Sequence, residues 1–467
     1  MACAPISTPI RPRVSGVSKP ARELDLSDRE RLLAHTDPEA VVAYRGGRPT
    51  TARQFLADVA QLAARLPAGK HVLNACADRY RFAVGFAASL VSERVSLLPS
   101  THTPEVIRHL RTFAPDVICL TDDPACAIEL PQFLYPGPAP VRSRSPEVPA
   151  PLATQLAAYV FTSGTTGTPV PHGKTWGRVA RCVRVEAARV GLDGQRGYSV
   201  VATVPPQHMY GFESTVLLAM LSGNAFTAER PFYPADVCSD LARVPRPRLL
   251  VSTPVHLRAL LAGQPALPEV DLVMSATAPL EIELARAVES RLGCPLLEIY
   301  GSTETGQIAS RWPTKTLEWR LWPGVVLSER DGRSWAQGGH IETPTPMGDV
   351  LEITEGDRFL LHGRTEDLVN IAGKRSSLAY LNHQLNAIPG VVDGAFFLRE
   401  TNAATGIARL AALVVAPGLD AGTITGLLRA RLDPVFLPRP LLLVDAIPRN
   451  ATGKLPLHVL KSLTACD

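Results

Sequence analysis

Short apolar runs alternate with amphipathic segments along most of the chain. The segments TARQFLADVAQLAARL, PVHLRALLAG and IELARAVESRLG repeat apolar residues at helical spacing. The runs DVICL, GYSVVATV, PRLLVST and PLLEIYG are short and apolar, which is typical of buried strands. This alternation predicts an α/β fold in which helices and largely buried strands form layers.

The pattern changes after residue 311, where strand-and-turn segments such as GDVLEIT and DRFLLHGR take over. A further unit with its own strands and helices begins at Arg364. We therefore predict a large layered α/β N-terminal domain over 1–363 and a smaller α+β C-terminal domain over 364–467. A chain of 467 residues is long enough for two or three domains.

Composition excludes several classes of protein. With 46% hydrophobic and 20% charged residues, the chain has the composition of a soluble globular protein. The N-terminus lacks the apolar segment of a signal peptide, and no run approaches the roughly 18 apolar residues of a membrane span. The eight cysteines are scattered without a C-x-x-C pair, which fits a cytoplasmic protein and gives no support to disulfides or zinc. A net charge of +4 is too small to indicate a nucleic-acid partner.

The segment YVFTSGTTGTPVPHGKTW at 159–176 combines small hydroxyl residues with glycines. Five residues separate Gly167 from Gly173, whereas a Walker-type phosphate loop has four, so a P-loop phosphotransferase is not favoured. Hydroxyls and glycine-freed N–H groups can still surround an anion, although a plain surface turn is the alternative. The candidate phosphate-binding residues are Thr162, Ser163, Gly164, Thr165, Thr166 and Gly167.

Further motifs decide between these interpretations. PPQHMYGFE contains P-x-x-H-x-x-G, IYGSTETG contains Y-G-x-T-E, and GD at 348–349 precedes GR at 363–364. VMSATAPL, GRTEDLVNIAGKR and IPRNATGKLPL complete the set. In this order, the motifs resemble those of the adenylate-forming superfamily, which includes acyl- and aryl-CoA synthetases, peptide-synthetase adenylation domains and luciferases. The resemblance covers roughly residues 150–460.

The resemblance implies an AMP-forming ligase that uses ATP and Mg²⁺ to adenylate a carboxylic acid. The acyl group would then pass to a phosphopantetheine thiol, on CoA or on an acyl carrier protein, after the mobile C-terminal domain has pivoted. Adenylation brings two anions together, so their charge must be neutralised. Mg²⁺ prefers carboxylate and phosphate oxygens, and a lysine supplies a positive point charge.

The implied roles fall on named positions. The catalytic residues are Thr303, Glu304, which is also the Mg²⁺ ligand, and Lys454. Adenine and ribose are bound by Thr277, Ala278, Pro279, Tyr300, Asp349 and Arg364, and the acyl pocket is lined by His208, Met209 and Tyr210. The hinge is Glu366, and the thiol path is lined by Gly373, Lys374 and Arg375.

The chain departs from the family pattern at a few positions. Val170 occupies the place of a lysine that usually follows the phosphate loop, and Lys174 is the candidate to supply the missing charge. Ala276 and Thr277 replace two glycines of the adenine-binding turn, which narrows the room for the backbone there. Glu366 stands where Asp or Lys is usual.

The sequence also bears on the acceptor and on the acid. From Arg364 onward there are 11 basic and 8 acidic side chains, an excess of basic residues that suits an acidic carrier protein. The compact length and the PHGKTW segment resemble small ligases of bacterial aryl-polyene and related pigment clusters, which implies a hydroxybenzoate- or hydroxycinnamate-like acid. Met209, Tyr210 and Phe212 could form a flat apolar pocket for it. The alternative is a non-catalytic nucleotide or acyl-adenylate binder, with Val170 as a sign of lost activity.

Overall fold

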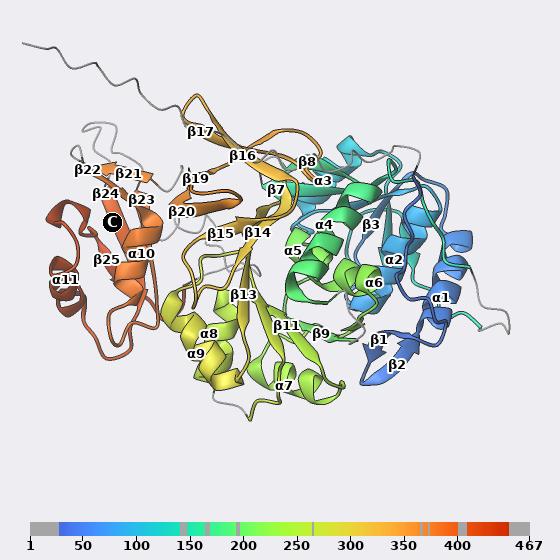
Figure 1. The fold of residues 1–467 in the computed structure, drawn as a ribbon, viewed down its shortest axis with the longest axis horizontal. Helices are drawn as coiled ribbons and strands as arrows, with labels where there is room; N and C mark the ends of the chain where they lie inside the picture. The colour runs from blue at the N-terminus through green and yellow to red at the C-terminus, as the bar shows by residue number, and fades with distance from the viewer. Residues whose placement is uncertain are drawn as a thin grey trace, which may run out of the picture.

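A computed structural model describes residues 28–140, 147–163, 169–192, 197–263, 266–364, 368–371, 374–399 and 409–447. In these ranges the chain forms two large sheets and three small ones, with helices packed against them (Figure 1). No helix there combines the length and the apolar character needed to cross a membrane. The predicted site residues outside these ranges are Gly164, Thr165, Thr166, Gly167, Glu366, Gly373 and Lys454.

The larger sheet has eleven strands, and its centre is parallel. The parallel strands are β9 (Ser199–Ala202), β10 (Ala225–Thr227), β11 (Arg248–Ser252), β12 (Leu272–Ser275) and β13 (Leu296–Ser302), with β1 (Val41–Arg45) beside β10 and β2 (Arg48–Thr51) at the edge. Antiparallel strands extend the other side: β14 (Gly306–Arg311), β15 (Trp319–Leu321), β20 (Arg358–Arg364) and β19 (Asp349–Ile353).

Both faces of this parallel centre are buried, as the unbroken apolar runs predict. Alternate strand residues such as Val201, Leu250 and Val273 pack against helices on one face, while Leu249 and Met274 belong to the main core on the other. The helices of the first face are α7 (Pro234–Ala242), α8 (Pro254–Ala262) and α9 (Ile282–Leu292).

The smaller sheet has six strands, in the order β6 (Gln132–Leu134), β5 (Ile118–Thr121), β3 (His71–Asn74), β4 (Val95–Leu98), β7 (Leu156–Ser163) and β8 (Pro169–Thr175). The helices next to its strands in sequence are α1 (Ala52–Arg65), α2 (Arg79–Val91), α3 (Pro104–Phe113) and α4 (Trp176–Val190). Phe86 of α2 packs edge-on against Phe212, with ring centroids 4.8 Å apart. This contact joins the six-stranded unit to the helix that follows β9.

The segment GFESTVLLAMLSG is helical, and its middle is a π-helix. It consists of α5 (Met209–Gly211), the π-helix η1 (Phe212–Leu217) and α6 (Leu218–Ser222). Every residue from 209 to 221 is buried. Short π-helical stretches are frequent at functional sites, and this one lies directly after the P-x-x-H motif.

The later part of the chain forms smaller units. A three-stranded sheet contains β16 (Val325–Arg330), β17 (Arg333–Gly338) and β18 (Thr345–Pro346). The remaining elements are β21 (Leu368–Ile371), β22 (Lys374–Ser377), α10 (Leu378–Asn386), β23 (Asp393–Arg399), β24 (Arg409–Val415), α11 (Ala421–Arg429), the 3-10 turn η2 (Pro434–Phe436) and β25 (Leu441–Leu443). These last elements have apolar clusters of their own. The boundary at 363 itself stays a prediction.

Candidate active site

The hairpin of β7 and β8 brings Thr162 next to His172. The Thr162 hydroxyl and His172 Nε2 share a hydrogen bond of 3.0 Å, and His172 Nε2 lies 3.7 Å from Glu304 Oε1. Burial lowers the pKa of His172, and the nearby Glu304 carboxylate opposes that shift. The start of the predicted phosphate segment and the predicted Mg²⁺ ligand are therefore neighbours, although more than a hundred residues separate them in sequence.

Glu304 is presented by a tight turn at the end of β13. The Ser302 N–H donates to Thr305 Oγ1, and the Thr305 N–H donates to Ser302 Oγ, each over 3.2 Å. A Cβ on Gly301 would lie 2.3 Å from the Gly306 carbonyl oxygen, so only glycine fits there. This locked turn also contains Thr303. The Glu304 side chain is 38% exposed, which leaves it accessible to a ligand.

Tyr300 and Asp349 are joined across the same sheet. The Tyr300 hydroxyl donates to Asp349 Oδ2 over 2.6 Å. The Tyr300 ring lies in an aromatic cluster, with its centroid 5.5 Å from that of Trp319 and 5.6 Å from that of Phe359. Asp349 pairs with Arg364 in the register of β19 and β20. Thus three residues predicted to bind adenine and ribose belong to one hydrogen-bonded sheet.

The predicted adenine-binding turn follows β12, the parallel neighbour of β13. The buried Glu298 carboxylate accepts from the Leu280 N–H over 3.1 Å and from Arg311 Nε over 2.7 Å, which holds the end of this turn. Ala278 is half-buried and Pro279 is exposed. Because β12 and β13 run in parallel, their carboxyl ends meet at one edge of the sheet, where ligands of open α/β sheets bind.

Thr277 adopts a left-handed backbone conformation with φ of 80°. A β-branched residue is strained in this conformation, whereas glycine is not. The substitution of glycine by Thr277 in the family pattern therefore costs backbone energy as well as space. No other described residue of the 272–280 segment has a positive φ.

We expect Thr277→Gly to raise the free energy of unfolding by about 1 kcal/mol, because relief of strain exceeds the entropy lost by a more flexible residue. Thr277→Ala is the control, since alanine keeps the Cβ that opposes a positive φ. Chemical denaturation of both variants measures the difference. A glycine variant less stable than the alanine variant would contradict the strain argument.

The P-x-x-H motif forms the entry to α5. A Cβ on Gly211 would lie 2.0 Å from the Pro205 carbonyl oxygen, which accounts for glycine at the end of the motif. The His208 carbonyl accepts from the Phe212 N–H over 2.7 Å, and His208 is half-buried. Met209 and Tyr210, the other predicted acyl-pocket residues, are each 8% exposed. Burial raises the pKa of Tyr210 well above its usual value.

Lys174 points into the protein. It is 4% exposed, and its ammonium donates to the Glu304 backbone carbonyl over 2.8 Å. Burial lowers the pKa of Lys174, and the Glu213 carboxylate opposes the shift. The prediction that Lys174 replaces the phosphate-loop lysine stays untested, because 164–168 lie outside the described residues. Val170, in the usual lysine position, is 43% exposed and faces Thr162 in the hairpin register.

Comparison with known proteins identifies the family to which this chain belongs. The family model described as "AMP-binding enzyme" matches residues 29–348. The chain belongs to the AMP-binding enzyme family. A 4-coumarate–CoA ligase of Rhodobacter capsulatus is 31% identical over 306 residues, which are 64% of this chain and 75% of that ligase. A 4-hydroxybenzoate–CoA/benzoate–CoA ligase of Rhodopseudomonas palustris is 25% identical over 446 residues, or 83% of this chain and 78% of that ligase.

Solved structures support the same fold. O-succinylbenzoate coenzyme A synthetase of Bacillus subtilis, in complex with ATP and magnesium ion, superimposes with a TM-score of 0.78 at 19% identity, over 93% of this chain and all of that one (100%). The predicted superfamily is therefore confirmed, and so is the predicted fold class of a large layered α/β domain with a smaller C-terminal one. This AMP-binding enzyme is an ATP-dependent acid–thiol ligase, as its sequence motifs imply.

Four of the predicted site residues lie at the ends of the described ranges. The backbones of Ser163, Arg364, Lys374 and Arg375 lie in β7, β20 and β22. Two residues near the site were not predicted from the sequence: His172, which links Thr162 to Glu304, and Glu213, which is buried beside Lys174. The sequence around them gives no sign of Glu304 beside His172 or of Lys174 beside Glu213.

Proposed function

We propose that this AMP-binding enzyme adenylates an aryl carboxylic acid with ATP and Mg²⁺ and transfers it to a phosphopantetheine thiol of CoA or of an acyl carrier protein. One observation carries the proposal: Thr162, His172 and Glu304 form a chain of contacts of 3.0 and 3.7 Å. Tyr300 and Asp349 lie on the same sheet, with Tyr300 four positions before Glu304. Residues that would hold the phosphates and the ribose thus approach one edge.

In this proposal a hydrogen-bond acceptor binds the ribose of the nucleotide, and hydrogen-bond donors bind its phosphates. The Asp349 carboxylate accepts hydrogen bonds, which suits the ribose hydroxyls, and Tyr300 keeps that carboxylate oriented. Thr162 and the residues up to Gly167 would donate to the β- and γ-phosphates. Lys454 would neutralise charge between the acid and the α-phosphate.

Glu304 fits a role as Mg²⁺ ligand. Within the described ranges, no group of three or more His, Cys, Asp or Glu side chains is placed to hold a metal by itself. Mg²⁺ in nucleotide enzymes is commonly bound by one or two carboxylates together with substrate phosphates, and keeps several waters. Glu304 offers one accessible carboxylate for such a site. The ion would neutralise phosphate charge when bound.

The aryl acid is supported by the relatives and by the residues after His208. The two ligases named above act, by their names, on coumarate and on benzoates. Met209 and Tyr210 offer buried, largely apolar surface, which suits a flat ring, and Met209 lines one cavity with Thr305 of the Glu304 turn. The names also specify CoA as the acceptor in those relatives, while the basic excess after Arg364 favours a carrier protein.

Mass spectrometry of the thioester product tests the proposal. The enzyme is incubated with ATP, Mg²⁺ and a panel of aryl and fatty acids, and CoA and a phosphopantetheinylated carrier protein compete as acceptors. We expect an aryl thioester on one of the two acceptors. Formation of fatty acyl thioesters alone would contradict the aryl assignment, and an adenylate that neither thiol accepts would contradict the transfer step.

We expect Tyr300→Phe to raise the KM for ATP about tenfold, because a hydrogen bond to a charged carboxylate contributes roughly 1.5–3 kcal/mol. The ring and its packing are retained, so kcat should change less than the KM. Steady-state kinetics with saturating acid measure both constants. An unchanged KM for ATP would show that the Asp349 carboxylate does not depend on Tyr300 to bind the nucleotide.

A further inference from the structure

Lys174 is buried behind the turn that carries Glu304. It is 4% exposed, and its ammonium donates to the Glu304 backbone carbonyl over 2.8 Å. Lys174 belongs to β8, and 130 positions separate it from Glu304 in the sequence. One side chain therefore ties this strand to the backbone of the residue that is predicted to bind Mg²⁺.

The carboxylate of Glu304 is contacted from the same strand. His172 lies two residues before Lys174 on β8, and its Nε2 is 3.7 Å from Glu304 Oε1. Residues two apart on a strand project from one face, so both side chains reach Glu304 from the same face of the hairpin. His172 approaches the carboxylate and Lys174 the backbone carbonyl.

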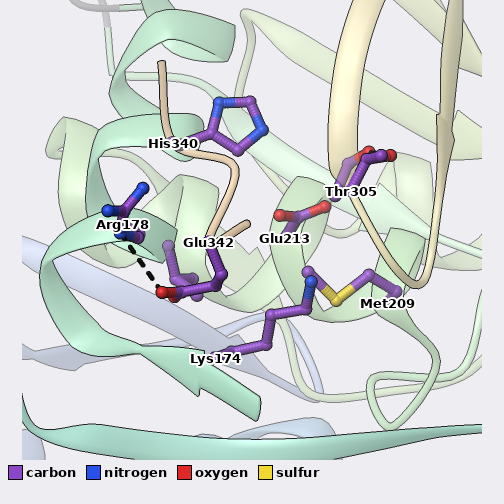
Figure 2. Close-up of a pocket in the computed structure, with 9 residues that line it drawn as sticks. Lys174, Arg178, Met209, Glu213, Thr305, His340 and Glu342 are labelled. Carbon is purple, nitrogen blue, oxygen red and sulfur yellow. Dashed lines mark hydrogen bonds and ion pairs between the residues drawn. The ribbon is translucent and has the colours of Figure 1, made fainter. Parts of the chain in front are cut away.

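A small polar cavity lies behind the turn (Figure 2). Lys174, Glu213, Thr305, Gly306 and His340 are among the residues that line it. Its free space is about 10 Å³, roughly the size of one water molecule, so a phosphate group has no room there. Figure 2 shows the ammonium end of Lys174 pointing toward Glu213. Lys174 therefore contacts other parts of the protein, and not a ligand, within this cavity.

Glu213 supplies the charge opposite Lys174. It is 1% exposed on η1. Burial lowers the pKa of Lys174, and Glu213 is the nearby group that most favours the charged form of the lysine. A Cβ on Gly306 would lie 3.0 Å from Glu213 Oε1 and 3.5 Å from His340 Nε2. Three buried polar side chains, those of Lys174, Glu213 and His340, thus pack behind residues 304–306.

The orientation of a carboxylate matters for Mg²⁺ more than for most cations. Mg²⁺ demands near-ideal octahedral geometry at about 2.0–2.1 Å from its oxygen ligands. Groups that orient a ligand without touching the ion typically change metal affinity by about 10- to 100-fold. The Glu304 side chain is 38% exposed, so its position depends on how firmly the backbone of the turn is held.

We propose that Lys174 is a positioning residue that fixes the turn of Glu304, so that the carboxylate is already oriented for the Mg²⁺ that accompanies ATP. The inference rests on the proposed function, since it takes Glu304 as the Mg²⁺ ligand. The role differs from the one predicted from the sequence: Lys174 acts through Glu304 and does not contact the phosphates.

Equilibrium titration of ATP, in Mg²⁺ and in EDTA, separates the two roles. We expect Lys174→Met to weaken ATP binding in Mg²⁺ by about tenfold, because the metal ligand is no longer held in place. ATP binding in EDTA should weaken by less than about twofold, since no phosphate contact is lost. A lysine that contacts phosphate would weaken binding to a similar extent in both conditions, and that result would overturn the inference.

Glu304→Gln shows whether Lys174 acts through Glu304. This variant should lose the Mg²⁺-dependent part of the ATP affinity. Adding Lys174→Met to it should change the affinity by less than about twofold, because two residues that act as one unit do not have additive effects. Full additivity of the two free-energy changes in the double variant would contradict the inference.

A second double variant covers the case in which Lys174→Met does not fold. Lys174→Met leaves Glu213 buried without its ammonium, whereas Lys174→Met/Glu213→Gln removes both charges. The double variant should show the same loss of ATP affinity in Mg²⁺ and almost none in EDTA. A wild-type affinity in Mg²⁺ would overturn the inference.

Glu186→Gln is the matched control. Glu186 is also fully buried, and it accepts from Gln307 over 3.3 Å, but it does not line the cavity. This variant should keep the wild-type affinities in both conditions, and a loss equal to that of Lys174→Met would contradict the inference. Wild-type ATP binding that is independent of Mg²⁺ would instead contradict the Mg²⁺ role of Glu304 in the proposed function.

Discussion

Arg79→Met is expected to lower the free energy of unfolding by about 3–5 kcal/mol, because four buried backbone carbonyls lose their charged hydrogen-bond donor. Arg79 is fully buried at the first turn of α2, and its two terminal nitrogens donate to four backbone carbonyls. The acceptors are Thr227 and Glu229, at 3.0 and 2.7 Å, and Ala202 and Val204, at 2.9 and 3.0 Å. Methionine has a similar volume but cannot donate to any of them.

The position of Arg79 explains the large expected loss in the free energy of unfolding. Ala202 and Thr227 are the last residues of β9 and β10, and Val204 lies in the loop that leads to His208. One side chain from the six-stranded unit thus caps two strands of the larger sheet. Its loss leaves the four carbonyls unsatisfied and loosens the entry to the proposed acyl pocket.

Arg320→Met serves as the control for this experiment. Its side chain is 61% exposed and pairs with Asp357 over 2.8 Å, so we expect a loss of less than about 1 kcal/mol. Denaturation by guanidinium chloride, followed by circular dichroism, compares the variants with the wild type. Equal small losses in both variants would mean that the Arg79 hydrogen bonds contribute little to stability.

Lys454→Ala is expected to lower the rate of adenylate formation by at least about 100-fold, because a preorganised charge at the reacting phosphate is lost. ATP affinity should change less than about threefold, since the phosphate loop, Glu304 and Asp349 are untouched. Lys454 lies outside the described residues, and its role follows from the IPRNATGKLPL motif. Acid-dependent pyrophosphate exchange measures the chemistry, and equilibrium titration measures ATP binding.

Lys461→Ala is the natural comparison, because it removes a lysine from the same terminal segment. It should leave both exchange and ATP binding unchanged. Transfer from preformed acyl-adenylate to the thiol should persist in Lys454→Ala, since a different face of the C-terminal domain would serve that step. If Lys454→Ala exchanges at the wild-type rate, the motif assignment is wrong.

The local pattern of apolar and polar residues was sufficient to predict the layered fold. The helical spacing of 51–66 gives α1, and the apolar runs ending in PLLEIYG give the parallel strands up to β13. The π-helical turn within 212–217 was not predictable, because a helix that is buried on all sides has no polar face whose period could reveal it.

The candidate site was predictable only where a motif marked it. The partnership of Tyr300 with Asp349 follows from two motifs, and the structure joins them by a hydrogen bond. His172 and Arg79 have no such mark, because Glu304, which His172 contacts, and the carbonyls that Arg79 binds lie more than a hundred residues away in sequence. Glu213 could have been noticed as a charge within an apolar helical run, but the sequence gives no sign of Lys174 opposite it.

Acid-dependent ATP–pyrophosphate exchange by the unmodified protein tests the central claim most directly, namely that Thr162, Glu304 and Asp349 surround a single ATP whose α-phosphate is attacked by a carboxylate. We predict exchange that requires both Mg²⁺ and an aryl acid, and that is fastest with a ring-hydroxylated one. Absence of exchange with every aryl and fatty acid supplied, or exchange that proceeds at the same rate without any acid, would contradict the account.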